Sequence, residues 1–332
     1  MMLSLCLAFV LSCAVTGWIR SYCLAHGIVD RPNHRSSHDR IVARGGGIGF
    51  SFIFLAAIVV MALQGSVSPR GAVGFTGGGC IVALTGWTDD RRGLSALSRI
   101  ICHFAASTWA VLWMGTVPAL SFGSITWQWG WFGQFVAITA FAWMINLYNF
   151  MDGTDGIAAV EAVTVAALSG LVCALAGMAS IGYAYWLLAG SVAGFLFWNW
   201  PPARIFMGDA GSGFLGFSFA WLALWCAMND GRVFAAVAIL MSIFVADATT
   251  TLLRRIAKGE KWHEPHRSHA YQKLARALGH RPVALGVAAI NILVLGPLAW
   301  VAWMRPGTGL FLLVATNAAL SMFVLRVRDA DR

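Results

Sequence analysis

The sequence has few charged residues and no long polar segment. Only 11% of its 332 residues are charged, whereas 59% are apolar and the mean hydropathy is +0.72. A soluble core formed by a chain of this length cannot cover that much apolar surface, so lipid must cover the rest. The composition excludes a soluble protein and predicts one integral membrane domain over residues 1–332.

The seven cysteines lack the paired spacing of a disulfide framework or a zinc site. The N-terminal apolar stretch also lacks a basic residue ahead of it, since the first positive charge is Arg20. A cleaved signal peptide would carry its positive charge first. Residues 3–19 are therefore predicted to be a retained first span.

Apolar runs of about membrane length predict an all-α, polytopic membrane protein with about 11 transmembrane helices. The runs fall near 3–19, 48–64, 73–87, 98–115, 131–148, 161–178, 183–198, 214–228, 233–251, 284–303 and 309–325. The loops on one side of the membrane are predicted near 20–47, 88–99, 149–160, 199–213 and 252–283, and together with the C-terminus they hold twenty of the 23 basic residues. By the positive-inside rule this side is cytoplasmic, with the N-terminus periplasmic and the C-terminus cytoplasmic.

The acidic residues gather on the same side, although the positive-inside rule does not govern them. Of the 14 acidic residues, only Asp230 lies neither on that side nor within about one helical turn of it. The chemistry is therefore expected on the cytoplasmic face.

Two adjacent carboxylates, Asp89 and Asp90, end the third predicted span. Because they repel each other, such a pair is held by a metal ion or by neighbouring arginines, and Arg91 and Arg92 follow directly. Two interpretations stay open: a functional site, or a solvated loop in which the two arginines neutralise the aspartates.

A second cluster closes the fifth span with Asn149, Asp152 and Asp155. The two aspartates are three residues apart, so they share a face of a helical turn. Either one could instead cap the helix that begins near Ile157. Asn146 precedes this cluster, so two asparagines and two aspartates lie at one membrane boundary. Capping alone does not explain all four, and this favours a functional role.

The glycine-rich segment 206–213 leads into the eighth span. Gly211, Gly213 and Gly216 match the dinucleotide-binding pattern, but no β-strand precedes them and no βαβ unit surrounds them, so that interpretation fails. A glycine-rich turn at a helix N-terminus still presents free N–H groups suited to phosphate, as at Gly211. Asp209 beside it is suited to hold Mg²⁺.

The longest cytoplasmic loop carries three histidines at a spacing of three, His263, His266 and His269. Pro265 prevents a regular helix through them, which disfavours a zinc site. With Arg267 among them they suit an anionic substrate, or else a basic loop that touches anionic lipid headgroups.

Two more features lie at membrane boundaries. Arg44 precedes a run of three glycines ahead of the second span, where cations and N–H groups converge. Asp247 lies about one turn inside the ninth span, where an unpaired charge is costly. We expect it to face the polar site or to pair with Arg254 or Arg255.

The ordered series of Asp89-Asp90, Asn149-x-x-Asp152-x-x-Asp155, Gly208-Asp209-Ala210-Gly211 and a late His/Arg loop resembles the polyprenyl-phosphate N-acetylhexosamine-1-phosphate transferases. The resemblance covers nearly the whole chain. It implies transfer of a sugar-1-phosphate from a UDP-N-acetylhexosamine to undecaprenyl phosphate, with release of UMP and with Mg²⁺ as cofactor.

The resemblance also implies roles for the residues. Asp209 would be the principal Mg²⁺ ligand, and Asp152 or Asp155 would help to build the metal and nucleotide site. Asp89 and Asp90 would lie near the lipid phosphate, one of them accepting its proton. The substrate-binding residues implied are Asn149, Gly211, His263, His266, Arg267 and His269.

Two departures bear on the branch of the family. Gly93 stands where many relatives have a polar or charged residue, and the late loop lacks the histidine-rich run of the muramoyl-pentapeptide branch. The chain therefore resembles more closely the branch that initiates O-antigen or exopolysaccharide synthesis. N-acetylglucosamine, N-acetylfucosamine and N-acetylquinovosamine all stay open as the sugar.

The implied location is the bacterial inner membrane, with the active site facing the cytoplasm. The implied partners are undecaprenyl phosphate, the UDP-sugar and membrane lipid, without nucleic acid and with a homodimer left open. The alternative from another class is a cation-coupled transporter. Transporters place ionisable residues near the bilayer midplane, whereas these carboxylates lie at span ends on one side, which favours an enzyme.

Overall fold

The computed structural model describes residues 2–30, 41–122, 125–127, 129–260 and 267–329, and most of them are helical. The longer helices are α1 (Met2–Ala25), α2 (Gly47–Leu63), α3 (Pro69–Arg92), α4 (Ala96–Met114), α5 (Gly130–Met151), α6 (Ile157–Leu175), α7 (Ala179–Asn199), α8 (Asp209–Ala227), α10 (Ser242–Ala257) and α14 (Gly309–Asp329). The shorter ones are α9 (Gly231–Leu240), α11 (Ala270–Leu278), α12 (His280–Ile290), the π-helix η1 (Asn291–Leu295) and α13 (Gly296–Met304).

The predicted all-α, polytopic fold is confirmed. Each predicted span coincides with a helix, with the bent pair of α9 and α10, or with the continuous run from α12 to α13. Within the described residues, eight helices are long and apolar enough to cross a membrane, and the pair α9–α10, bent by 67°, would make a ninth. The count of eleven and the orientation stay predictions.

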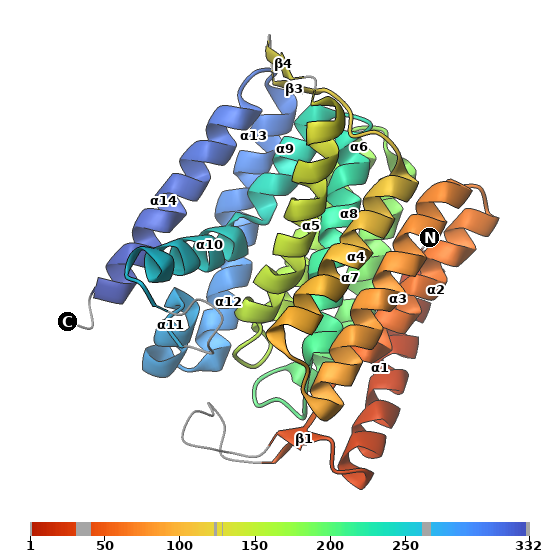
Figure 1. Ribbon diagram of the computed structural model, residues 1–332, viewed down its shortest axis with the longest axis vertical. Helices are drawn as coiled ribbons and strands as arrows, with labels where there is room; N and C mark the ends of the chain where they lie inside the picture. The colour runs from red at the N-terminus through yellow and green to blue at the C-terminus, as the bar shows by residue number, and fades with distance from the viewer. Residues whose placement is uncertain (1, 31–40, 123–124, 128, 261–266, 330–332) are drawn as a thin grey trace.

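The junction of α3 and α4 illustrates how local sequence ends and begins these helices. Gly93 follows α3 with φ of 68°, a conformation that glycine adopts without strain. The hydroxyl of Ser95 then accepts the N–H of Ser98 at 3.1 Å and caps α4. The short connection turns the chain back, so that α4 packs antiparallel against α3 (Figure 1).

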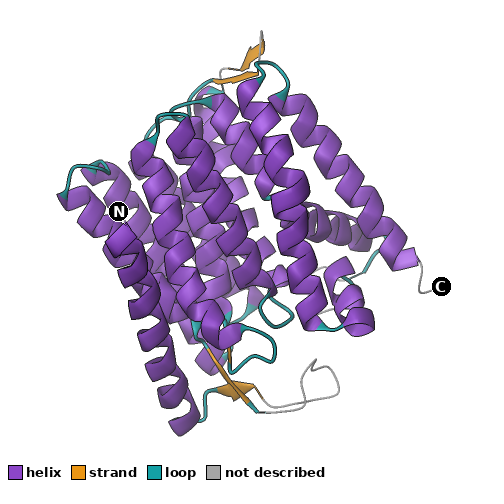
Figure 2. Ribbon diagram, turned by 180° about the vertical axis from the view of Figure 1, so that it is seen from behind, coloured by secondary structure: helices purple, strands orange, loops and turns teal. Residues whose placement is uncertain are grey.

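A small sheet lies at one end of the helix bundle. It consists of β1 (Val29–Asp30), β2 (Val42–Arg44) and β5 (Ile205–Phe206), while the hairpin of β3 (Leu120–Phe122) and β4 (Ile125–Trp127) lies at the opposite end (Figures 1 and 2). The central strand β2 pairs antiparallel with β1 and parallel with β5, with Arg44 opposite Phe206. This pairing joins two loops that are far apart in sequence.

Helix α8 forms the centre of the bundle, and nearly all of its residues are buried. It packs against α2, α3 and α5, and its glycines allow the close approach. A Cβ at Gly216 would overlap the carbonyl oxygen of Met144 on α5. Because α8 is enclosed in this way, its first residue, Asp209, lies among the ends of α3 and α5.

We predict that Gly216→Ala lowers the melting temperature of the purified protein in detergent. The added methyl group would push α5 and α8 apart, an overpacking cost of about 1–3 kcal/mol. Gly286→Ala on α12 is the matched control, because a Cβ there meets no atom within 4 Å and glycine is a weaker helix former than alanine. Equal losses in the two variants would contradict this account of the packing.

Candidate active site

Asp90, near the end of α3, caps the N-terminus of α8. Its side chain is 0% exposed. Its Oδ1 accepts the N–H of Asp209 at 3.0 Å and its Oδ2 accepts the N–H of Ala210 at 3.2 Å. These are two of the N–H groups that a helix start leaves without an intrahelical partner, and a carboxylate there also interacts favourably with the helix dipole.

Glycines make this approach possible. A Cβ at Gly86 would overlap the backbone of Asp209 and Ala210, and a Cβ at Gly208 would overlap the carboxylate of Asp90. Gly208 also has φ of 74°, which non-glycine residues rarely adopt. The Gly-Asp-Ala sequence is therefore explained by close packing of α3 on the start of α8.

Two arginines bind the aspartates. Arg44, at the end of β2, donates from Nε to Asp90 at 2.7 Å and from Nη2 to Asp209 at 2.8 Å. Arg99, on the first turn of α4, donates from Nη1 to Asp89 at 3.0 Å and to Asp209 at 3.4 Å. The two cations thus link three carboxylates that come from two helices.

The end of α5 completes the cluster. Asn149 donates from Nδ2 to Oδ2 of Asp209 at 3.1 Å. Asp152 follows three residues later, and burial raises its pKa well above the usual range. Repulsion by Asp209 raises that pKa further, as does the more weakly acting Asp90, while Arg44 lowers it.

The charges of the cluster suit a divalent cation. Three carboxylates (Asp89, Asp90 and Asp209) are bonded to two guanidinium groups (Arg44 and Arg99), which leaves one excess negative charge before the nearby carboxyl of Asp152 is counted. Among the described residues, no group of three or more His, Cys, Asp or Glu side chains is arranged to hold a metal by itself. Mg²⁺ commonly uses one or two carboxylates plus waters and substrate phosphates, so these oxygen donors fit Mg²⁺ shared with a phosphate substrate.

Asp155 contacts a different set of residues. Its Oδ2 accepts the N–H of Ala203 at 3.0 Å and is 3.4 Å from Nδ1 of His280. Helix α6 begins after Gly156 without a side-chain cap, and the N–H of Gly156 donates instead to Oδ1 of Asn199. The alternative in which Asp152 or Asp155 caps this helix is therefore wrong.

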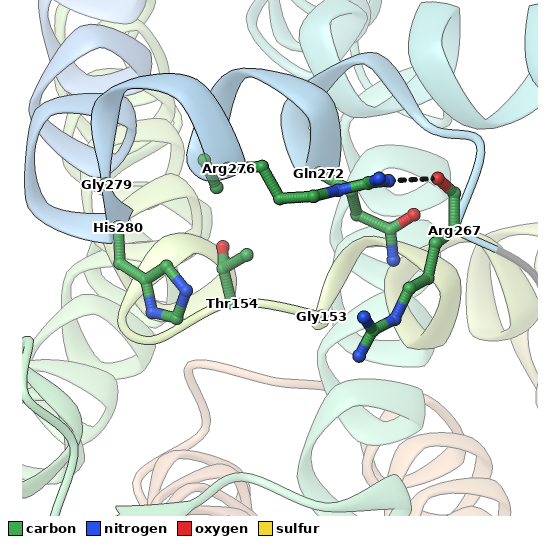
Figure 3. Close-up of a pocket in the computed structure, with 8 residues that line it drawn as sticks. Gly153, Thr154, Arg267, Gln272, Arg276, Gly279 and His280 are labelled. Atoms are coloured by element: carbon green, nitrogen blue, oxygen red, sulfur yellow. Dashed lines mark hydrogen bonds between the residues drawn. The ribbon is translucent and has the colours of Figure 1, made fainter. Parts of the chain in front are cut away.

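A pocket of about 410 Å³ lies against the loop between α5 and α6 (Figure 3). It is lined by Gly153, Thr154, Arg267, Gln272, Ala275, Arg276, Gly279 and His280. The guanidinium of Arg276 donates to the carbonyl oxygen of Arg267 at 2.8 Å, the bond drawn in Figure 3. Cationic side chains on one wall and the loop backbone on the other suit an anionic ligand.

The residues of the late loop separate into three groups. His263 and His266 lie outside the described residues. Arg267 lines the pocket, as a residue that binds an anionic substrate would. His269 is buried at 3% exposure, with its ring stacked near Phe150 and its Nδ1 3.3 Å from Asp247, so it does not line the pocket.

The predicted phosphate site at the glycine-rich turn is also different in the structure. The N–H groups of Asp209 and Ala210 are not free, because Asp90 accepts both. The N–H of Gly211 donates to the carbonyl of Gly208 at 3.1 Å, and Gly211 packs against the backbone of Gly47. This close packing explains why a glycine stands at position 211. Its role in substrate binding stays a prediction.

Sequence reasoning missed Arg99, Gln272, Arg276 and His280. Gln272 and Arg276 are four residues apart and so share a face of α11, a spacing that was available in the sequence. Arg99 carried no such signal, because only the packing of α4 on α3 brings it to Asp209. Asp247 pairs with neither Arg254 nor Arg255, and instead accepts N–H groups of α11.

Comparison with known proteins gives a consistent set of matches. The profile of glycosyl transferase family 4 matches residues 72–227, which include the aspartates of the cluster and Asn149. The chain is 28% identical to the probable undecaprenyl-phosphate N-acetylglucosaminyl 1-phosphate transferase of Bacillus subtilis, over 88% of this chain and 83% of the relative.

Two further relatives carry similar names. The decaprenyl-phosphate N-acetylglucosaminephosphotransferase of Mycolicibacterium smegmatis is 29% identical, over 87% of this chain and 79% of its own. The undecaprenyl-phosphate alpha-N-acetylglucosaminyl 1-phosphate transferase of Escherichia coli is 26% identical, over 76% of this chain and 70% of its own.

We predict that Asp90→Asn destabilises the protein more than Asp89→Asn. Asp90 accepts two backbone N–H groups of α8 and the Nε of Arg44, so breaking this buried arrangement should cost about 3 kcal/mol. Asp89 accepts the N–H of Leu94 and a bond from Arg99, and its loss leaves the start of α8 capped. Melting temperatures in detergent test this, and a larger drop for Asp89→Asn would refute it.

Proposed function

We propose that the chain is a member of glycosyl transferase family 4, whose profile matches residues 72–227, and that it transfers an N-acetylhexosamine 1-phosphate from a UDP-sugar to undecaprenyl phosphate. The products are a lipid diphosphate sugar and UMP. The names of the relatives support this, since they describe N-acetylglucosamine 1-phosphate transfer to polyprenyl phosphates. The observation that carries the proposal is the aspartate and arginine cluster around Asp209, next to a pocket with cationic side chains.

The chemistry of the reaction explains why these residue types are needed. A lipid phosphate and a nucleotide diphosphate bring several negative charges together, so catalysis depends on positioning and on cations more than on covalent steps. In this proposal the pocket binds the UDP-sugar, with Arg267 and Arg276 toward its negative charges. Arg44 and Arg99 supply positive charge beside the aspartates and hold their orientation.

Asp209 is assigned as the principal ligand for Mg²⁺, with Asp152 as a second carboxylate. Bound Mg²⁺ would neutralise charge on the diphosphate and polarise its oxygens. Asn149 orients the Asp209 carboxylate by its bond to Oδ2. Asp89 is assigned as the group that accepts a proton from the lipid phosphate, because Asp90 has no exposed surface and its oxygens hold α8 and Arg44.

We also propose where the protein acts and which synthesis it starts. The chain is taken as one catalytic domain over residues 1–332 in the bacterial inner membrane, with its site facing the cytoplasm, where UDP-sugars are made. The reaction would initiate O-antigen or a related polysaccharide. N-acetylglucosamine is the first sugar to test, because the matched relatives are named for it.

The decisive experiment uses purified full-length protein with undecaprenyl phosphate and a panel of UDP-N-acetylhexosamines. We expect formation of a lipid diphosphate sugar and exchange of labelled UMP, both lost with EDTA and restored by Mg²⁺. Asp209→Asn should lower turnover by about a thousandfold or more while the protein stays folded, since it removes the main metal ligand.

The result also separates the alternatives. Near-normal turnover of Asp209→Asn would show that the metal assignment is wrong. No reaction with any UDP-sugar, together with solute uptake in proteoliposomes, would favour the cation-coupled transporter. Arg232→Ala is the matched control variant, because Arg232 pairs with Asp230 at the start of α9, away from the cluster.

A further inference from the structure

Asp247 is a buried carboxylate that the proposed reaction does not use. It lies on α10, which runs across the bundle, and its side chain is 6% exposed (Figure 1). Its Oδ1 accepts the N–H of Ala270 at 3.1 Å and its Oδ2 accepts the N–H of Tyr271 at 3.1 Å. These are the first two N–H groups of α11, so Asp247 caps a helix that follows it by more than twenty residues.

The other contacts of Asp247 are equally buried. The hydroxyl of Thr251 donates to its Oδ1 at 3.1 Å, and Nδ1 of His269 lies 3.3 Å from the same oxygen. The His269 ring in turn stacks near Phe150, at the end of α5. The carboxylate therefore connects α10, the start of α11 and the end of α5.

Helix α11 depends on such contacts for its position. It has nine residues, and a helix of that length is unstable alone in water. At its first turn the hydroxyl of Tyr271 donates to the carbonyl of Phe150 at 2.9 Å. Gly153 permits this approach, since a Cβ there would overlap the Tyr271 hydroxyl. Asp247 on one side and the loop after α5 on the other thus hold α11.

The same helix forms one wall of the pocket. Gln272, Ala275 and Arg276 come from α11. Of these, Gln272 and Arg276 lie across from Gly153 and Thr154 in Figure 3. A shift of the first turn of α11 would move all three side chains together. Asp247 does not line the pocket, so it would affect the ligand only through α11.

We propose that Asp247 is a positioning residue. By anchoring the N-terminus of α11, it holds the wall of the pocket formed by α11 in the position that binds the UDP-sugar. The inference rests on the proposed function in one respect, that the pocket takes the UDP-sugar. Loss of the anchor then weakens binding of the UDP-sugar and leaves binding of the lipid phosphate unchanged.

The test compares Asp247→Asn with the native full-length protein. The variant keeps the side-chain volume but removes the charge and turns one acceptor into a donor that faces an N–H group. We expect the KM for the UDP-sugar to rise about tenfold, with the KM for undecaprenyl phosphate changed by less than about twofold. Amide hydrogen exchange should rise in residues 268–279 and stay unchanged in α6.

Asp230→Asn is the matched control. Asp230 also places a carboxylate at a helix start, where its Oδ1 accepts the N–H of Arg232 at 2.7 Å, but that helix is α9 and not part of the pocket. Both KM values and exchange in 268–279 should match those of the native protein. If Asp247→Asn does not fold, Tyr271→Phe, which removes the hydroxyl that donates to Phe150 beside Gly153 and Gln272, should raise the KM for the UDP-sugar about threefold.

Hydrogen exchange keeps this inference separate from the proposed function. If the native protein neither turns over nor binds UMP, the proposed function fails, while exchange in 268–279 still tests the anchor. Unchanged exchange there in Asp247→Asn would overturn the inference, whatever the activity. Raised exchange with an unchanged KM for the UDP-sugar would show that the position of α11 does not control binding of the UDP-sugar.

Discussion

The capping of α8 by Asp90 is the interaction on which the rest of the candidate site depends. One carboxylate holds two backbone N–H groups of α8 and the guanidinium of Arg44, and it has no exposed surface. This ties the ends of α3, β2 and α8 together and fixes Asp209 between two arginines. Because buried charges need partners, the cluster is stable only when all of these contacts form together.

A second buried carboxylate caps a helix start at the pocket. Asp247 caps α11 from α10, as Asp90 caps α8 from α3, and each time the carboxylate comes from another part of the chain. Nearby glycines allow the close packing, since a Cβ at Gly86 would overlap the start of α8 and a Cβ at Gly153 would overlap the Tyr271 hydroxyl on α11. Two aspartates that sequence reasoning linked to proton transfer or to arginine pairing thus cap the starts of α8 and α11.

Much of the fold and part of the site follow from sequence. Apolar runs of membrane length locate the helices, because backbone groups in lipid must bond within their own segment. The motifs also identify Asp89, Asp90, Asn149 and Asp209, which the structure brings together. The three-stranded sheet was not predicted, because strands of two or three residues carry no periodic signal and pair only after the helices pack.

The sequence by itself determined the fold class, the helix positions and the polar residues that gather at one end of the bundle, since these follow from local hydropathy and residue chemistry. Tertiary structure alone decided which of the polar residues hold one another. Arg99 reaches Asp209 through helix packing, and His269 is buried instead of facing the pocket. The physical reason is that hydrogen-bond partners are chosen by distance in space, and a loop sequence does not encode which distant N–H group or guanidinium will lie within 3 Å or so of a given carboxylate.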